Sequence, residues 1–192
     1  MTFPTQLTLA RIGLTFLIMG LLFVPGVAAK AIALALFLLA SFTDWLDGFL
    51  ARRYHDVSDL GALLDPIADK VLILGMLLAF VQLRLIPAWM VLIVALREFV
   101  ITGVRLYAAS RHRVLSAATE GKHKTVSQMV AICALPITLV LSDLVERTAV
   151  PWQVLTSVHW AAQVCVWTML LLTISSGVSF FWRHRRVLRH AQ

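Results

Sequence analysis

The strongest constraint on this chain is a series of long apolar runs that are separated by short polar or basic segments. Hydrophobic residues make up 60% of the 192 residues, and charged residues only 14%. Such runs are typical of membrane-spanning helices, because a span needs about 20 apolar residues to cross the hydrocarbon core. The sequence predicts six spans, over residues 9–24, 29–42, 59–81, 87–109, 125–144 and 152–180. We therefore expect an all-α integral membrane protein in which residues 1–192 form a single transmembrane domain.

The basic residues are unevenly divided between the two sides of the membrane. Six spans place both termini on the same side, and if that side is the cytoplasm, its segments hold eleven Lys and Arg residues against three opposite. The eleven are Arg11, Arg52, Arg53, Arg111, Arg113, Lys122, Lys124, Arg183, Arg185, Arg186 and Arg189; the three are Lys30, Arg84 and Arg147. Because Lys and Arg concentrate in cytoplasmic loops, we expect both termini in the cytoplasm and the chain in the inner (plasma) membrane. The net charge of +7 then reflects contact with anionic membrane lipids, and no nucleic-acid partner is expected.

Six of the ten acidic residues lie in one stretch, Asp44–Asp69. Its first part has helical steps of three and four through Asp44, Asp47, Gly48, Ala51 and Arg52, and its second part has steps of four through Gly61, Asp65 and Asp69. Residues at these steps share one face of a helix. Two facing helices would each present a pair of carboxylates, and the small residues would leave room for a ligand between them.

Four carboxylates in a medium of low dielectric constant repel one another strongly. Hard divalent cations such as Mg²⁺ or Mn²⁺ relieve that repulsion and prefer oxygen ligands, so the pattern predicts a metal site. A solvated acidic loop is the plain alternative, but a loop has no reason to keep helical spacing on both flanks. A small divalent-metal transporter is another alternative. It is disfavoured because transport sites lie near the membrane midplane, whereas Asp44 and Asp47 follow the end of the second apolar run.

All eight of these spaced residues coincide with the signature of a known family, because Asp44-x2-Asp47-Gly48-x2-Ala51-Arg52-x8-Gly61-x3-Asp65-x3-Asp69 resembles that of the CDP-alcohol phosphatidyltransferases. The resemblance implies an integral membrane transferase that moves a phosphatidyl group from a CDP-lipid to an alcohol and releases CMP. It also implies site residues. Two Mg²⁺ or Mn²⁺ ions would be held by Asp44, Asp47, Asp65 and Asp69, with Asp69 also the general base. The CDP-lipid would be bound by Asp47, Gly48, Ala51, Arg52 and Gly61, although Arg52 alternatively serves as an anchor at the membrane edge.

A second group of polar residues occurs between the fourth and fifth apolar runs. It reads Arg97-Glu98-x4-Gly103-x-Arg105 and then Gly121-Lys122-His123-Lys124-Thr125-x2-Gln128. These segments resemble the bacterial phosphatidylglycerophosphate synthase branch of the family, which implies CDP-diacylglycerol as donor and sn-glycerol 3-phosphate as acceptor. Lys and Arg side chains suit a dianionic phosphate, so we expect Arg105, Lys122 and Lys124 to bind the phosphate of the acceptor. If these residues are only membrane anchors, another acceptor such as inositol phosphate, serine or phosphatidylglycerol becomes the alternative.

Several smaller expectations concern the segments around the apolar runs. Arg97 and Glu98 are about 100° apart on a helix, which predicts that they are not a direct pair. Residues 111–124 are expected to form a basic connection, and residues 143–151 a polar turn. A secretory signal peptide is an alternative for the first run, although its start lacks a basic cluster.

The last third of the chain, residues 129–192, is informative mainly through its hydropathy. We expect it to serve packing and formation of a homodimer among membrane lipids. The small residues that would permit close helix approach are Ala161, Ala162, Ser175, Ser176 and Gly177. Cys133 and Cys165 lie within apolar runs, so we expect small core residues and neither a disulfide nor a metal pair.

Overall fold

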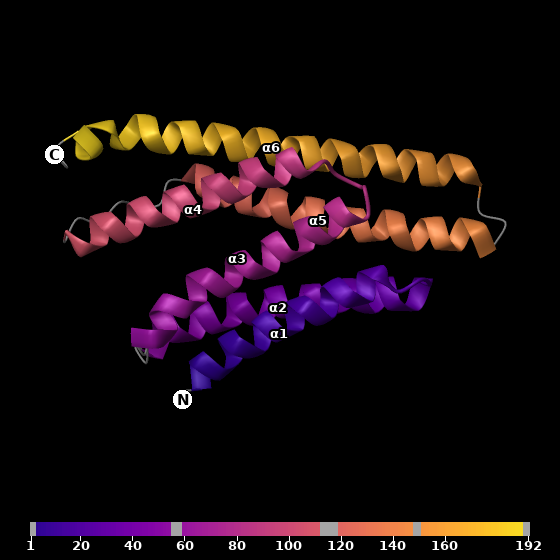
Figure 1. The fold of residues 1–192 in the computed structure, drawn as a ribbon, viewed down its shortest axis with the longest axis horizontal. Coiled ribbons are helices and arrows are strands. Elements are labelled where there is room, and N and C mark those ends of the chain that lie inside the picture. The colour runs from indigo at the N-terminus through magenta and orange to yellow at the C-terminus, as the bar shows by residue number, and fades with distance from the viewer. Residues whose placement is uncertain (1–2, 55–58, 112–118, 148–150, 190–192) are drawn as a thin grey trace.

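The computed structural model describes the backbone of residues 3–54, 59–111, 119–147 and 151–189, and the side chains of residues 9–43, 68, 70–111, 123–145, 151–183 and 185. Every regular element in these residues is a helix (Figure 1). The helices are α1 (Phe3–Phe23), α2 (Val27–Tyr54), α3 (Asp59–Gln82), α4 (Ala88–Ser110), α5 (Thr119–Arg147) and α6 (Trp152–Arg189). The expected all-α class is confirmed.

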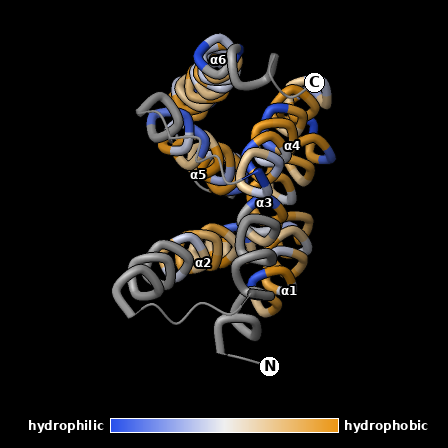
Figure 2. Tube along the Cα trace, turned by 90° about the vertical axis from the view of Figure 1, so that its left-hand side faces the viewer, coloured by the Kyte–Doolittle hydropathy of each residue, from blue (hydrophilic) through white to orange (hydrophobic). Residues whose placement is uncertain are grey.

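The helices form two groups that meet along the middle of the molecule. In the first, α1 packs against both α2 and α3, and in the second α6 packs against both α4 and α5. Contacts of α2 with α5 and of α3 with α4 and α5 join the groups. Figure 2 views the helices nearly end on and shows α3 between the two groups. Both termini lie at the same end of the molecule in Figure 1.

The first group contains a very close approach between α1 and α3. A Cβ atom added to Gly75 of α3 would lie 2.7 Å from Cγ2 of Thr15 and 3.2 Å from Sδ of Met19 on α1. A glycine is therefore required at position 75, because any larger residue would push the two helices apart. The buried face of α1 that packs here also carries Ile18 and Leu22.

The outer surface is unusually apolar for a folded chain. Large side chains such as Phe16, Trp160 and Leu171 are each more than 60% exposed. Figure 2 shows that much of the chain in these helices is hydrophobic. Monomeric soluble proteins rarely expose apolar surface this extensively, so the surface indicates contact with lipid.

Two helical segments within the described residues are long and apolar enough to cross a membrane by themselves, His123–Val145 and Trp152–Arg183, each with a mean hydropathy of 1.9. Shorter apolar helices occupy Leu9–Phe23, Val27–Thr43 and Lys70–Gln82. These segments correspond to five of the six predicted apolar runs, while the remaining run, in α4, carries Arg97, Glu98 and Arg105 within it.

Two of the expected connections are wrong in part, because the helices extend into them. Helix α5 begins at Thr119, so Lys122 and Lys124 belong to its first turns and not to a loop. The same helix continues to Arg147, which places Asp143 inside a helix where a turn was expected. Its carboxylate accepts hydrogen bonds from Nζ of Lys30 at 2.6 Å and from the backbone nitrogen of Gly26 at 3.2 Å. A partner on another helix therefore explains this polar residue.

Candidate active site

The acidic motif lies on the two helix segments that flank residues 55–58. Asp44, Asp47, Gly48, Ala51 and Arg52 belong to the last part of α2, and Gly61, Asp65 and Asp69 to the first part of α3. Both segments are helical, as their spacing predicted, and the short connection places them at the same end of the molecule. The side chains of these eight residues lie outside the described ones, so their roles as metal ligands, base and CDP-lipid contacts stay predictions.

Helix α5 runs antiparallel to α2, and an ion pair fixes the register of the two helices. Lys30 of α2 pairs with Asp143 of α5. Nineteen residues further along α2 is Phe49, and nineteen residues back along α5 is Lys124. Because both helices rise about 1.5 Å per residue, Lys124 comes level with the segment that contains Asp47 and Gly48. The start of α5 is thus level with the acidic motif of α2, at the same end of the molecule (Figure 1).

Helix α6 runs parallel to α4 with a nearly constant register. The amide nitrogen of Gln163 donates to the carbonyl oxygen of Leu85 at 3.2 Å. The rings of Trp89 and Trp167 are 6.1 Å apart between centroids. Further along, Arg97 Nη2 donates to Oγ of Ser176 at 3.0 Å. These contacts place Arg97 and Ser176 at one level of the molecule.

A buried group of charges joins α4, α5 and α6 at this level. Lys124 Nζ donates to Oε1 of Glu98, and Arg97 Nη1 lies 3.3 Å from the same oxygen. We call Arg97, Glu98, Lys124 and Ser176 the three-helix cluster. The side chains of Arg97, Glu98 and Lys124 are only 15%, 14% and 5% exposed. The cluster connects helices that are far apart in the sequence through one carboxylate.

The prediction that Arg97 and Glu98 are not a direct pair is wrong. Their Cα–Cβ bonds do point about 100° apart, but the long Arg97 side chain bends back toward its neighbour's carboxylate. The apolar surroundings strengthen this attraction, because both side chains are largely shielded from bulk water. Packing therefore overrides the simple helical-wheel argument.

The three residues expected to bind the acceptor phosphate have different surroundings. Lys124 is buried against Glu98, and Lys122 lies on the first turn of α5 with its side chain outside the described set. Arg105 is exposed, and its guanidinium carbon lies 5.8 Å from the ring centroid of Phe180 on α6. Among described side chains, the structure thus joins Lys124 to Glu98 and Arg105 to an aromatic ring.

Other buried polar residues near these sites had no role in the site predicted from the sequence. Arg11 is 6% exposed and shares the buried face of α1 with Thr15, although it was expected to anchor the cytoplasmic surface. One turn separates it from Thr15, which faces Gly75 of α3, so Arg11 comes level with residues 68–72, next to Asp69. Its steps of four and seven to Thr15 and Ile18 were a usable signal of burial. Thr173 and Gln128 are also buried, at 0% and 2% exposure.

Comparison with known proteins agrees with the acidic motif. The sequence profile of the CDP-alcohol phosphatidyltransferase family matches residues 1–182. A CDP-diacylglycerol–glycerol-3-phosphate 3-phosphatidyltransferase of Bacillus subtilis is 35% identical, over 97% of this chain and 96% of the relative. A protein of the same name from Rickettsia bellii is 30% identical, over 93% and 92%. A probable phosphatidylglycerophosphate synthase of Mycobacterium tuberculosis is 36% identical, over 94% and 80%.

The family profile matches nearly the whole chain, and the relatives have similar lengths. Both findings assign the chain to the same family as its acidic motif does. The protein belongs to the CDP-alcohol phosphatidyltransferase family.

Proposed function

We propose that this protein transfers the phosphatidyl group of CDP-diacylglycerol to sn-glycerol 3-phosphate, giving phosphatidylglycerophosphate and CMP, in phospholipid biosynthesis. The observation that carries this proposal is the register of α2 and α5, which brings Lys124 level with the acidic motif. An acidic segment for a metal–pyrophosphate complex is then at the same level of the molecule as a basic segment for a phosphorylated acceptor. The relatives named for this reaction support the same substrates.

The residues of the motif fit a divalent metal site. Asp44, Asp47, Asp65 and Asp69 offer only carboxylate oxygens, which are the donors that Mg²⁺ and Mn²⁺ prefer. They stand on consecutive helices at one end of the molecule. When bound, two such ions supply neutralisation of the pyrophosphate charge and of the developing charge on CMP.

The other motif residues act on the donor and on the proton. Asp69 accepts the proton of the primary hydroxyl while that oxygen bonds to the phosphorus bearing the lipid, and the bond from this phosphorus to CMP breaks. Gly48, Ala51 and Gly61 leave space for the nucleotide, which contacts Asp47 and Arg52. Positioning of the two substrates accounts for most of such catalysis.

The basic residues hold the acceptor. Arg105, Lys122 and Lys124 bind its phosphate, so that its free hydroxyl points toward the carboxylates of α2 and α3. The register of α5 against α2 supports this arrangement for Lys124. Its bond to Glu98 keeps the ammonium group at one place between α4 and α5.

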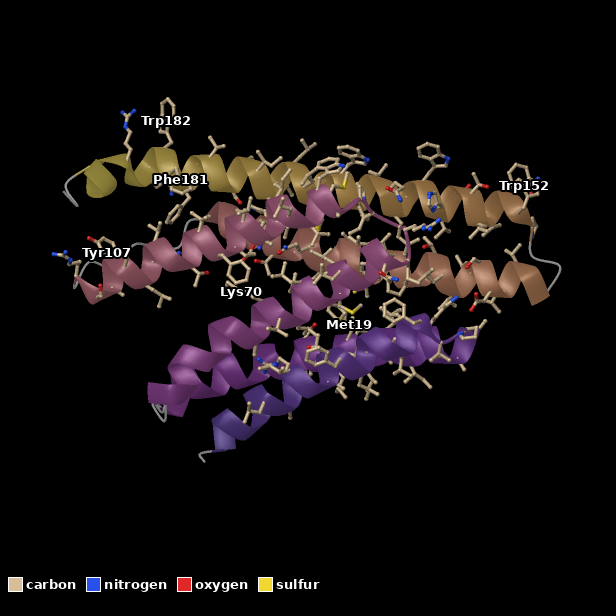
Figure 3. All side chains as sticks on the ribbon, viewed as in Figure 1. Met19, Lys70, Tyr107, Trp152, Phe181 and Trp182 are labelled. Atoms are coloured by element: carbon tan, nitrogen blue, oxygen red, sulfur yellow. The ribbon has the colours of Figure 1, made fainter. Side chains whose placement is uncertain are left out.

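The proposed setting is the inner membrane, with one domain over residues 1–192, six spans, cytoplasmic termini and assembly into a homodimer. Aromatic side chains support the span of α6, since Trp152 near one end and Trp182 near the other are 66% and 70% exposed. Figure 3 shows Tyr107 and Phe181 at the same end as Trp182. Trp and Tyr collect at both membrane surfaces. The thirty residues between the two tryptophans rise about 45 Å, close to the full thickness of a bilayer.

An acceptor panel tests the proposal. Purified protein in detergent receives CDP-diacylglycerol, Mg²⁺ or Mn²⁺, and in turn glycerol 3-phosphate, inositol phosphate, serine and phosphatidylglycerol, while CMP release is measured. We expect release with glycerol 3-phosphate. Release only with a different acceptor would overturn the substrate and keep the family.

The Asp69→Asn variant tests the role of the base. Asparagine has nearly the same shape but cannot accept the proton, so we expect turnover to fall at least about 1000-fold. Binding of CDP-diacylglycerol, measured by thermal stabilisation of the protein, should be largely retained. Full turnover in this variant would exclude Asp69 as the base.

A further inference from the structure

One buried arginine in the first group of helices has no part in the reaction described above. Arg11 is the only charged residue of α1, and it is only 6% exposed. A guanidinium group is always charged, and a charge buried in apolar surroundings is costly unless it is paired. Thr15, one turn later, is neutral and donates its hydroxyl to the carbonyl oxygen of Arg11 at 2.9 Å. A carboxylate on a neighbouring helix is therefore the partner that Arg11 requires.

The acidic stretch is the source of such a carboxylate. Helix α1 packs against α2 and α3. All acidic residues of these three helices lie between Asp44 and Asp69. Asp143 of α5, which also contacts α2, is already paired with Lys30. The buried charge of Arg11 thus connects α1 to the acidic motif.

The contact between α1 and α3 indicates which helix supplies the carboxylate. Arg11 and Thr15 are four positions apart, so they share one face of α1. That face is turned toward α3, because a Cβ atom added to Gly75 would lie only 2.7 Å from Cγ2 of Thr15. The two helices run in the same direction (Figure 1). Arg11, one turn before Thr15, therefore comes level with residues 68–72 of α3.

The reach of the arginine side chain then selects position 65. Side chains of a helix lean toward its N-terminus, and an extended arginine covers about one helical turn. The guanidinium of Arg11 thus reaches the level of residues 64–68. At 3.6 residues per turn, position 65 is about 80° around α3 from Gly75, and position 69 is about 120°. Asp65 is therefore the acidic residue of α3 whose position is turned more nearly toward α1.

We propose that Arg11 is a positioning residue of the active site and that its guanidinium donates a hydrogen bond to the carboxylate of Asp65. This bond sets the rotation of the carboxylate and presents its other oxygen to a divalent cation. The positive charge of Arg11 also offsets part of the repulsion among the four carboxylates before a metal binds. The catalytic part of this inference rests on the proposed function, to which it adds a residue outside the acidic motif.

The contact is tested by thermal unfolding in detergent, with a chelator and without substrate. In the original protein, Arg11→Gln leaves a buried carboxylate without its partner, so we expect the melting temperature to fall by about 10 °C. In the Asp65→Asn background that partner is already gone. The same change of Arg11 should then lower the melting temperature by less than about 3 °C, because two residues in contact are not additive.

Three matched backgrounds control this measurement. Asp143→Asn removes a carboxylate that pairs with Lys30, so Arg11→Gln should there cause the full loss. Most of the loss should also persist in the Asp44→Asn and Asp69→Asn backgrounds. If Arg11→Gln alone is too unstable to purify, its yield of folded protein is compared instead. We expect Asp65→Asn to restore that yield and Asp143→Asn to leave it low.

Arg11→Lys separates a positioning role from a purely structural one. Lysine keeps the charge and most of the stability, but its ammonium group cannot hold a carboxylate in the planar geometry of a guanidinium. At saturating Mg²⁺ we expect kcat to fall about tenfold, because a metal ligand is held less exactly. The KM values for CDP-diacylglycerol and for the acceptor should stay within about twofold of the original. A residue that only joins α1 to α3 would leave kcat of the folded protein unchanged.

Three results would overturn the inference. An equal loss of stability in the original protein and in the Asp65→Asn background would exclude Asp65 as the partner. Disappearance of the loss in the Asp44→Asn or Asp69→Asn background would assign the bond to that carboxylate instead. An unchanged kcat in Arg11→Lys would leave Arg11 with a structural role alone. The unfolding measurements need neither substrate nor metal, so they remain decisive for the contact even if the acceptor panel contradicts the proposed function.

Discussion

Two groups of ion-paired side chains among the described residues join helices, and they differ in how many helices they connect and in what lies around them. Lys30 and Asp143 join α2 to α5 with one cation and one carboxylate, and the backbone nitrogen of Gly26 occupies the second carboxylate oxygen. The three-helix cluster joins α4, α5 and α6, and in it Arg97 and Lys124 share the carboxylate of Glu98. The first pair has both carboxylate oxygens occupied, whereas the second lies beside buried donors of Arg97, Gln128 and Thr173 that have no hydrogen-bond partner among the described residues.

The difference shows how structural and functional charges can be told apart in an apolar protein. A neutral pair whose oxygens are occupied offers nothing to a ligand and serves to hold two helices together. A group with spare buried donors is costly unless another molecule completes its hydrogen bonds. If only burial and ion pairing were compared, both groups would look like structural ion pairs.

Removal of the central carboxylate should have the largest effect. In Glu98→Ala, the buried Arg97 and Lys124 lose the carboxylate that they share, so we expect the free energy of unfolding to fall by about 3–5 kcal/mol. Thermal unfolding in detergent measures this change. An unaltered melting temperature would mean that Glu98 does not hold the cluster together.

Swapping the two charged residues within each ion pair should have the second largest effect and should distinguish the two groups. The double variant Lys30→Asp, Asp143→Lys reverses the charges of a pair whose only role is to hold two helices together. We therefore expect it to retain most of the stability and full turnover. Glu98→Lys with Lys124→Glu also keeps an attractive pair, but it moves the ammonium group away from the proposed acceptor. Here we expect stability to recover relative to either single change, while kcat/KM for glycerol 3-phosphate falls about 100-fold. Full activity of the variant with Glu98→Lys and Lys124→Glu would show that both groups serve only to hold helices together.

The smallest effect should come from Asp143→Asn. The pair is 11% and 17% exposed at its side chains, and asparagine retains an oxygen for Lys30, so we expect a loss of about 1–2 kcal/mol. Both KM values and kcat of the folded protein should remain as before. A changed acceptor KM in this variant would show that the neutral pair also influences the site.

The helices themselves could be predicted well from hydropathy and from residues that interrupt helices. Pro25 and Gly26 separate α1 from α2, and Gly26 adopts a φ of 117° that favours glycine. Pro87 precedes α4 as its N-cap. The acidic motif was placed correctly on two successive helices, because its spacing of three and four residues has no other simple explanation.

The remaining features depend on contacts that a sequence pattern does not contain. Asp143 resembled a turn residue until Lys30, 113 positions away, supplied its partner. Thr173 gave no signal, since a single threonine in an apolar helix usually bonds its own backbone. The paired charges of Arg97 and Glu98 reflect the direction of one long side chain, which helical geometry alone does not determine.

The pair of Lys30 and Asp143 has a consequence for biosynthesis. Ribosomes add about 5–20 residues per second, so Asp143 is made roughly 6–23 s after Lys30. During that interval α2 carries an ammonium group without its final counter-charge, and lipid headgroups or water must solvate it at the membrane edge. Arrival of α5 then supplies that counter-charge. The second half of the nascent chain thus completes the insertion of the first.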